Sequence, residues 1–151
     1  MRSGTESVKA ALLDTNILTA YLTPNHPSHQ FVIDEILALR HRGYQLWVAP
    51  QCLYELWAVL TRPIEANGFG RTPEEADQAL EQVRADFIFR EDPPGIVDEW
   101  RRLCVAYQIV GKRAHDARIV AYMRGHGIAE LLTLNGDDFQ TFASRGDIRF
   151  V

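Results

Sequence analysis

Short apolar runs that alternate with helical patterns are the feature that most limits how this chain can fold. The run from Val8 to Leu13 is broken only by Lys9 and predicts a buried central strand. Four more segments are expected to be strands: 44–49, 87–89 (an edge strand), 131–134 and 148–151. Because helical patterns separate these runs, we expect an α/β layered domain with a mainly parallel sheet.

Turn and cap residues mark the ends of the predicted helices. Gly43 is expected to end a helix opened by His26-Pro27-Ser28. Its packing side is expected to hold five apolar residues: Phe31, Val32, Ile36, Leu37 and Leu39. Pro50 begins the next helix. Thr72-Pro73-Glu74-Glu75 is a strong helix start, with Thr as the cap, Pro in the first position and Glu three residues after the cap.

Length and composition indicate one ordinary globular domain over residues 1–151, with residues 1–7 as a flexible N-terminus. Hydrophobic residues make up 46% and charged residues 24% of the chain, which excludes disordered and membrane-spanning classes. The polar N-terminus lacks the apolar core of a signal peptide, so we expect a cytoplasmic protein. The only two cysteines, Cys52 and Cys104, fall in helical apolar patterns and are expected to be buried thiols rather than zinc ligands.

The net charge of -4 argues against a large basic surface for nucleic acid. A protein of this charge that contacts phosphates is expected to do so through a local basic cluster or through bound cations.

Acidic residues occupy four places that favour a functional site. Asp14 directly follows the first predicted strand, and the segment Asn135 to Asp138 follows the strand at 131–134. Glu55 lies early in the helix after another strand, and Asp116 lies just ahead of an apolar helical stretch. In a parallel sheet all four places belong to the carboxyl edge, where open α/β sheets hold their ligands.

Each acid also has a simpler structural interpretation. Asp14 could merely cap the helix that follows it, and Asp116 could be a helix cap paired with Arg113 or Arg118. Glu55 needs a partner, either a cation or an arginine. Several carboxylates at one edge would repel one another and raise one another's pKa values, whereas Mg²⁺ or Mn²⁺ would reverse that penalty.

Four motifs taken together resemble those of the PIN domain, and specifically of VapC-like toxin ribonucleases. They occur in the family's order and spacing, over nearly the whole chain from residue 10 to 151: Leu13-Asp14-Thr15-Asn16, Tyr54-Glu55-Leu56, His115-Asp116-Ala117 and Thr133-Leu134-Asn135-Gly136-Asp137-Asp138-Phe139. The resemblance implies a three-layer α/β/α fold and a Mg²⁺- or Mn²⁺-dependent endoribonuclease. It further implies a homodimer and the toxin of a type II toxin–antitoxin pair, inhibited by a cognate antitoxin.

The resemblance also implies roles for individual residues. Asp14 and Asp116 match the acids that hold the metal, and Glu55 matches the second acid of the site. Asn135 stands where the family commonly has a fourth acid, so Asp138, or else Asp137, is expected to supply that charge. Thr15 and Asn16 match a position that orders the first acid or the attacking water.

The implied chemistry is hydrolysis of RNA by a metal-activated water, leaving a 5′-phosphate and a 3′-hydroxyl. Candidate ligands for neighbouring phosphates are the basic residues Lys112, Arg113, Arg118 and Arg62, which could equally be solvated helix ends. His115 is expected to be structural.

Two other functions remain open from the sequence. A non-catalytic RNA- or partner-binding PIN-like domain would tolerate the asparagine at 135. A metal-dependent phosphatase of another α/β class is disfavoured, because the haloacid-dehalogenase type needs a second aspartate where this chain has Asn16.

Overall fold

A single parallel sheet lies at the centre of the part of the chain that the structure describes, residues 8–151. The structure is a computed structural model, and the predicted flexible segment 1–7 lies outside the described residues. The strand order is β3-β2-β1-β4-β5, and every neighbouring pair is parallel. The strands are β1 (Ala10–Leu13), β2 (Gln45–Val48), β3 (Ile88–Phe89), β4 (Glu130–Leu132) and β5 (Arg149–Phe150).

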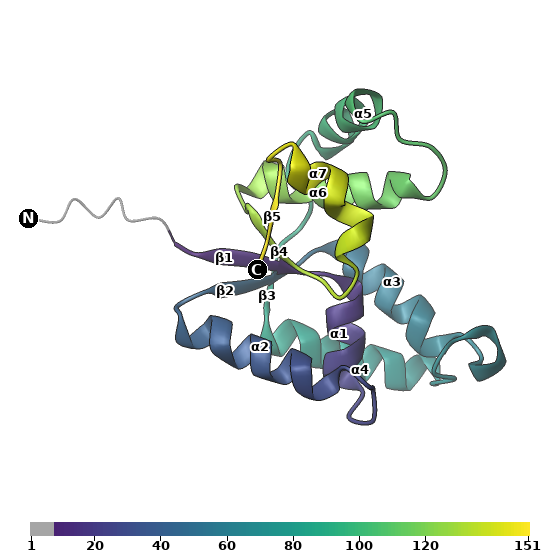
Figure 1. Ribbon diagram of the computed structural model, residues 1–151. Helices are drawn as coiled ribbons and strands as arrows, with labels where there is room; N and C mark the ends of the chain where they lie inside the picture. Colours follow the sequence, from purple (N-terminus) through teal and green to yellow (C-terminus); the bar gives the residue numbers. More distant parts are fainter. Residues whose placement is uncertain (1–7) are drawn as a thin grey trace, which may run out of the picture.

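Helices cover both faces of this sheet, so the expected three-layer α/β/α architecture is confirmed. Helices α1 to α4 lie on one face, and α5 to α7 lie on the other (Figure 1). The α-helices are α1 (Thr15–Leu22), α2 (His29–His41), α3 (Pro50–Thr61), α4 (Pro73–Asp86), α5 (Ile96–Ala106), α6 (Arg113–His126) and α7 (Gln140–Ser144). Two short 3-10 helices, η1 (Ile64–Ala66) and η2 (Gly136–Phe139), lie in the connections.

Strand β1 is central because its sequence carries no polar side chain. Ala11, Leu12 and Leu13 are completely buried, and the strand pairs with β2 on one side and β4 on the other. Side chains buried on both faces are what a strand in the middle of a parallel sheet requires. Leu13 lies opposite Leu132 in this pairing, so the residues that follow β1 and β4 emerge side by side.

The strand order also locates a crevice. The chain passes from β1 outward through β2 to β3, and then returns to place β4 on the other side of β1. Ligands of open α/β sheets bind beyond the carboxyl ends of the strands at such a reversal of order. Residues that follow β1 and β4 are therefore the ones that the fold brings to this crevice.

Several local expectations need correction. Phe31 and Leu37, expected on the packing side of α2, are 54% and 59% exposed, because Val32, Ile36 and Leu39 form its buried stripe. Cys52 is buried as expected, but Cys104 is only partly buried. The strands are shorter than predicted, and Val8 and Lys9 precede β1 in exposed positions.

The predicted start of α4 is confirmed in detail. Thr72 accepts a hydrogen bond from the Glu75 backbone, and the Glu75 side chain accepts one from the Thr72 backbone. Among the helices of residues 8–151, none combines the length and the apolar content that crossing a lipid bilayer would require.

Candidate functional site

Asp14 is the first residue after β1 and is buried, with 8% of its surface exposed. Its Oδ1 accepts a hydrogen bond from the Thr15 backbone N–H at 2.8 Å, so it caps α1 as the simpler interpretation allowed. Its own N–H donates to the Leu132 carbonyl at 3.0 Å, which ties it to β4. Burial raises the pKa of Asp14 above its ordinary value, and the negative charges of Glu55 and Asp138 add to that effect.

Thr133, the residue after β4, holds Asp14 from the other side. Its Oγ1 donates to Oδ2 of Asp14 at 2.8 Å and accepts from the Asn135 backbone N–H at 3.0 Å. Asn16 joins the same network, since its amide donates to Thr133 at 3.2 Å and its carbonyl accepts from the Leu134 N–H at 3.0 Å. Sequence reasoning assigned no role to Thr133. The signal for it was its position directly after a buried strand, level with Asp14.

Glu55 faces Asp14 from the second turn of α3. Its two carboxylate oxygens accept from Thr15 Oγ1 at 2.7 Å and from Gln51 Nε2 at 3.0 Å. The partner that Glu55 was expected to need is thus a pair of neutral donors, not an arginine. Thr15 and Asn16 both contact acids of the site, as expected of residues that order it.

Gln51 is a second residue that sequence reasoning missed. Its side chain is buried, and besides Glu55 it bonds to the His115 carbonyl at 2.9 Å and to Arg118 at 3.1 Å. It therefore joins α3 to the first turns of α6. The available signal was its spacing of four residues before Glu55, which places both on one helix face.

Asp116 lies in the first turn of α6 and does not cap it. The residue at the cap position is Lys112, and Arg118 forms its ion pair with Asp92 at 2.6 Å. The interpretation of Asp116 as a cap paired with Arg118 is therefore wrong. Partial burial and the charges of Asp138 and Asp14 raise the pKa of Asp116 to about 6, against a smaller opposing effect of Arg113.

The segment after β4 supplies Asp138 rather than Asp137. The carboxylate of Asp138 lines the same pocket as Asp14 and Asp116, whereas Asp137 is exposed outside it. Asn135 is not itself an acid of the site. Its amide donates to Oδ2 of Asp138 at 2.7 Å and so fixes that carboxylate.

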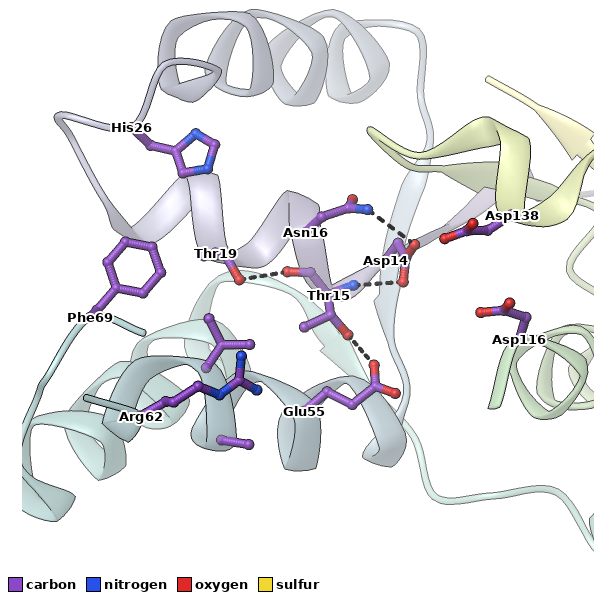
Figure 2. A pocket seen from close by; sticks show the side chains of 12 residues that line it. Asp14, Thr15, Asn16, Thr19, His26, Glu55, Arg62, Phe69, Asp116 and Asp138 are labelled. Carbon is purple, nitrogen blue, oxygen red and sulfur yellow. Dashed lines mark hydrogen bonds between the residues drawn. The ribbon is translucent and has the colours of Figure 1, made fainter. Parts of the chain in front are cut away.

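These acids open onto one pocket of about 550 Å³. Figure 2 shows Asp14, Asp116 and Asp138 pointing toward one another, with Glu55 beside Thr15. The pocket continues past α1 and α3 to a second end, which is lined by His26, Arg62 and Phe69.

The acids fit a hard divalent cation by type. None of the ion pairs found among residues 8–151 involves these four carboxylates. Over the same residues no group of three or more aspartate, glutamate, histidine or cysteine side chains is arranged so that it could hold a metal ion. Mg²⁺ does not need such a group, because it is commonly held by one or two carboxylates and keeps several waters. Asp14 and Asp116 are the pair that would hold it.

The basic residues that we expected to bind substrate phosphates have different surroundings in the structure. Arg118 is held by Asp92 and Gln51, so that expectation needs correction. Lys112 is exposed outside the pocket lining, and Arg113 is near enough to lower the pKa of Asp116. Arg62 lines the pocket itself. His115 contributes its backbone carbonyl to Gln51, in keeping with a structural role.

Comparison with known proteins identifies a family and a fold. The PIN domain family matches residues 11–144 of this chain. No curated protein sequence matches the chain.

Solved structures of similar fold come from bacterial toxin–antitoxin systems. VapBC2 of Rickettsia felis, bound to a DNA fragment from its promoter, gives a TM-score of 0.68 at 14% identity, with 94% of this chain and 97% of that chain covered. VapBC-1 of nontypeable Haemophilus influenzae gives 0.64 at 19% identity, covering 94% and 96%. VapC20 of Mycobacterium tuberculosis, a sarcin–ricin loop cleaving toxin, gives 0.62 at 18% identity, covering 87% and 94%.

Proposed function

The chain belongs to the PIN domain family, and on that premise we propose that it is a divalent-metal-dependent endoribonuclease, the toxin of a type II toxin–antitoxin pair. One observation carries the proposal. Asp14, Glu55, Asp116 and Asp138 line a single pocket at the carboxyl edge of the sheet, and no basic side chain forms an ion pair with them in residues 8–151.

In this proposal Asp14 and Asp116 hold a Mg²⁺ or Mn²⁺ ion. The bound cation supplies a water of lowered pKa and stabilises negative charge on the scissile phosphate. Asp14 is prepared for this role because Thr15 and Thr133 fix both of its oxygens. A carboxylate held in place by such bonds loses no further side-chain freedom when it binds a ligand.

Glu55 and Asp138 complete the site as groups that orient water. Thr15 and Gln51 orient Glu55, and Asn135 orients Asp138. Each of these donors is neutral, so none of them forms an ion pair with the acid that it orients. The asparagine at 135 thus supports an acid of the site, and it gives no reason to favour a non-catalytic domain.

The proposed partners follow from the structural neighbours. Solved structures of this fold include VapBC toxin–antitoxin complexes and one toxin that is named as cleaving the sarcin–ricin loop. We extend both properties to this chain as a proposal: RNA as substrate and a cognate antitoxin as inhibitor. A homodimer remains a prediction, which light scattering of the purified chain would check.

A cleavage assay tests the proposed activity. The purified chain is incubated with end-labelled RNA plus Mn²⁺, Mg²⁺ or EDTA, and the product ends are mapped. We expect cleavage only with a divalent cation and products that carry a 5′-phosphate. Binding of RNA without cleavage under any metal would instead support the non-catalytic binding domain and contradict the enzyme.

A further inference from the structure

The end of the pocket away from the acids has no part in the reaction proposed above. Three side chains line it: His26 from the connection between α1 and α2, Arg62 from the end of α3, and Phe69 from the connection between α3 and α4. Figure 2 shows them on the side of Thr15 and Thr19 opposite to Asp116 and Asp138. The pocket therefore joins an acidic end to an end with an aromatic ring, a guanidinium and an imidazole.

Backbone hydrogen bonds hold the loop that carries Phe69 against the end of α3. The Phe69 N–H donates to the Val59 carbonyl at 3.2 Å, and the Gly70 and Arg71 N–H groups donate to the Arg62 and Leu60 carbonyls, both at 2.8 Å. These bonds satisfy carbonyls at the end of α3 that would otherwise lack partners. They also fold the loop back against the helix, which sets the Phe69 ring at the pocket.

Gly68 makes that close return possible. A Cβ atom at this position would lie 2.0 Å from the Arg62 carbonyl oxygen, a distance that no real side chain tolerates. The backbone of the loop therefore returns to the end of α3, and the partly buried Phe69 side chain packs against the core while it lines the same pocket as Arg62.

Arg62 and His26 both retain hydrogen-bonding capacity. The Arg62 side chain is exposed and makes no hydrogen bond or ion pair with another described residue, although it lines the pocket. His26 Nδ1 accepts from the Ser28 N–H at 3.0 Å, so the proton of the neutral ring sits on Nε2. That leaves Nε2 as a donor.

We propose that His26, Arg62 and Phe69 form a nucleotide subsite for single-stranded RNA. An unpaired base stacks on the Phe69 ring, Arg62 binds an adjoining phosphate, and His26 donates a hydrogen bond to the nucleotide. Stacking on an aromatic ring is the usual way in which proteins hold unpaired bases, and it must be joined by a cation near the backbone. The inference rests on the proposed function, because it places one nucleotide of the substrate beside the bond that is cut.

The mixture of groups favours a nucleotide over a protein segment as the occupant. The aromatic ring matches the base of one nucleotide, the Arg62 guanidinium, which has no partner among residues 8–151, matches its phosphate, and the imidazole donor matches its sugar or base edge. The whole pocket, acidic end included, has a volume of about 550 Å³, which lies within the range of small-molecule pockets. The adjoining acids also need a cation before an anionic chain can pass, which agrees with the metal proposed there.

The test measures base stacking directly, apart from cleavage. A short single-stranded RNA that carries the fluorescent base 2-aminopurine is titrated with the full chain in the presence of Mn²⁺. All proteins carry Glu55→Gln, which removes a water-orienting acid but keeps the proposed metal pair of Asp14 and Asp116, so that the RNA stays intact while Mn²⁺ can still bind. Stacking on Phe69 should quench the fluorescence of the base.

Two substitutions with matched controls decide the outcome. Phe69→Leu keeps an apolar side chain without the ring, and it should abolish the quench and weaken binding by about fivefold or more. Arg62→Gln should also weaken binding and lower the slope of log affinity against log salt by about 0.7, the value for one phosphate of a single strand. The controls are Phe31→Leu on α2 and Arg101→Gln on α5, exposed residues outside the pocket, which should leave binding unchanged.

Failure of this inference can be told from failure of the proposed function. Absence of a quench in the parent protein, or equal binding by Phe69→Leu and Phe31→Leu, overturns the subsite even if the natural chain cleaves RNA. A quench that depends on Phe69 in a chain that cuts no RNA upholds the subsite and overturns the ribonuclease. Melting curves of the variants show that each protein is folded at the temperature of the titration, and the exposed Arg62 provides a second readout that the loop's stability does not affect.

Discussion

Thr133 and Asp14 stand 119 residues apart in the chain and share a 2.8 Å hydrogen bond at the carboxyl edge of the sheet. Each is the first residue after its strand, and the parallel pairing of β1 with β4 brings them level. The Thr133 hydroxyl donates to Asp14 and so lowers the pKa of Asp14, which burial raises. Asp14 is thereby favoured in the charged form that a metal ligand needs.

Thr133→Val should weaken both the site and the fold. Valine keeps the shape of threonine, but it removes the donor to Asp14 and the acceptor of the Asn135 N–H. We expect a loss of about 1–3 kcal/mol in unfolding free energy, the usual cost of unpaired buried groups next to a charge. Cleavage should fall at least about tenfold if Asp14 then drifts from its position. Thr133→Ser, which keeps the hydroxyl, should retain most of both quantities, and equal losses in Ser and Val would contradict the role of the hydroxyl.

Gln51→Met should uncouple Glu55 from α6. The substitution keeps the volume of a buried side chain but removes the hydrogen bonds that Gln51 makes with Glu55, the His115 carbonyl and Arg118. Thermal unfolding should show a loss of about 1–3 kcal/mol, and the KM for RNA should change less than kcat, since Gln51 acts through Glu55. Gln82→Met on the exposed face of α4 is the control and should behave as the natural chain. A Gln51→Met protein with natural stability would show that the bridge between α3 and α6 contributes nothing.

The sheet and the acids of the pocket could be predicted because both follow from local patterns. An apolar run that ends at an aspartate, as at Leu13-Asp14, shows both a buried strand and the place where it ends. Asp138 could be preferred to Asp137 from the sequence but not fixed, since the choice depends on how the 3-10 turn η2 orients the two side chains.

The contacts that hold the acids could not be predicted. Gln51 and Thr133 are uncharged, and their roles depend on which atoms face them from α6 and β1. Arg118 was misplaced for a similar reason. Its guanidinium forms an ion pair with Asp92, which lies 26 residues earlier in the chain. No local pattern in the sequence indicates that pairing. The prediction that Phe31 is buried was wrong, because the helical period of α2 allowed a wider buried stripe than the neighbouring helices cover.

Without metal, the chain should become more stable in mild acid. The pKa of Asp116 is raised to about 6 in the folded protein from an ordinary value of 3.8. A raised acid pKa means that the folded state binds the proton more tightly, so this contribution is full below the ordinary value and is lost as the pH rises through about 6. Between about pH 7.5 and pH 5.5 it amounts to at most about 1 kcal/mol, before screening by solvent.

The measurement is a series of metal-free melts across that pH interval. The natural chain should gain roughly 2–4 °C in Tm toward the acidic end, and Asp116→Asn should gain less, because the titrating group has gone. The same pH dependence in both proteins would assign the effect to other carboxyls.

Asp116→Asn should separate binding of metal from stability of the fold. In the natural chain Mn²⁺ should raise the Tm by mass action, because the cation binds the folded state and has no formed site in the unfolded chain. Asparagine keeps the shape of the side chain but removes a charge assigned to the metal, so the Mn²⁺-dependent rise should shrink and RNA cleavage should fall by orders of magnitude. Without metal the variant should be as stable as the natural chain or more so, because one repelling carboxylate has gone from beside Asp14 and Asp138.

Asp137→Asn, at the exposed acid outside the pocket, is the matched control and should change none of the three quantities. Full activity in Asp116→Asn would remove this residue from the metal site, whereas an unchanged Tm of the natural chain across a Mn²⁺ titration would count against the whole acidic cluster as a cation site.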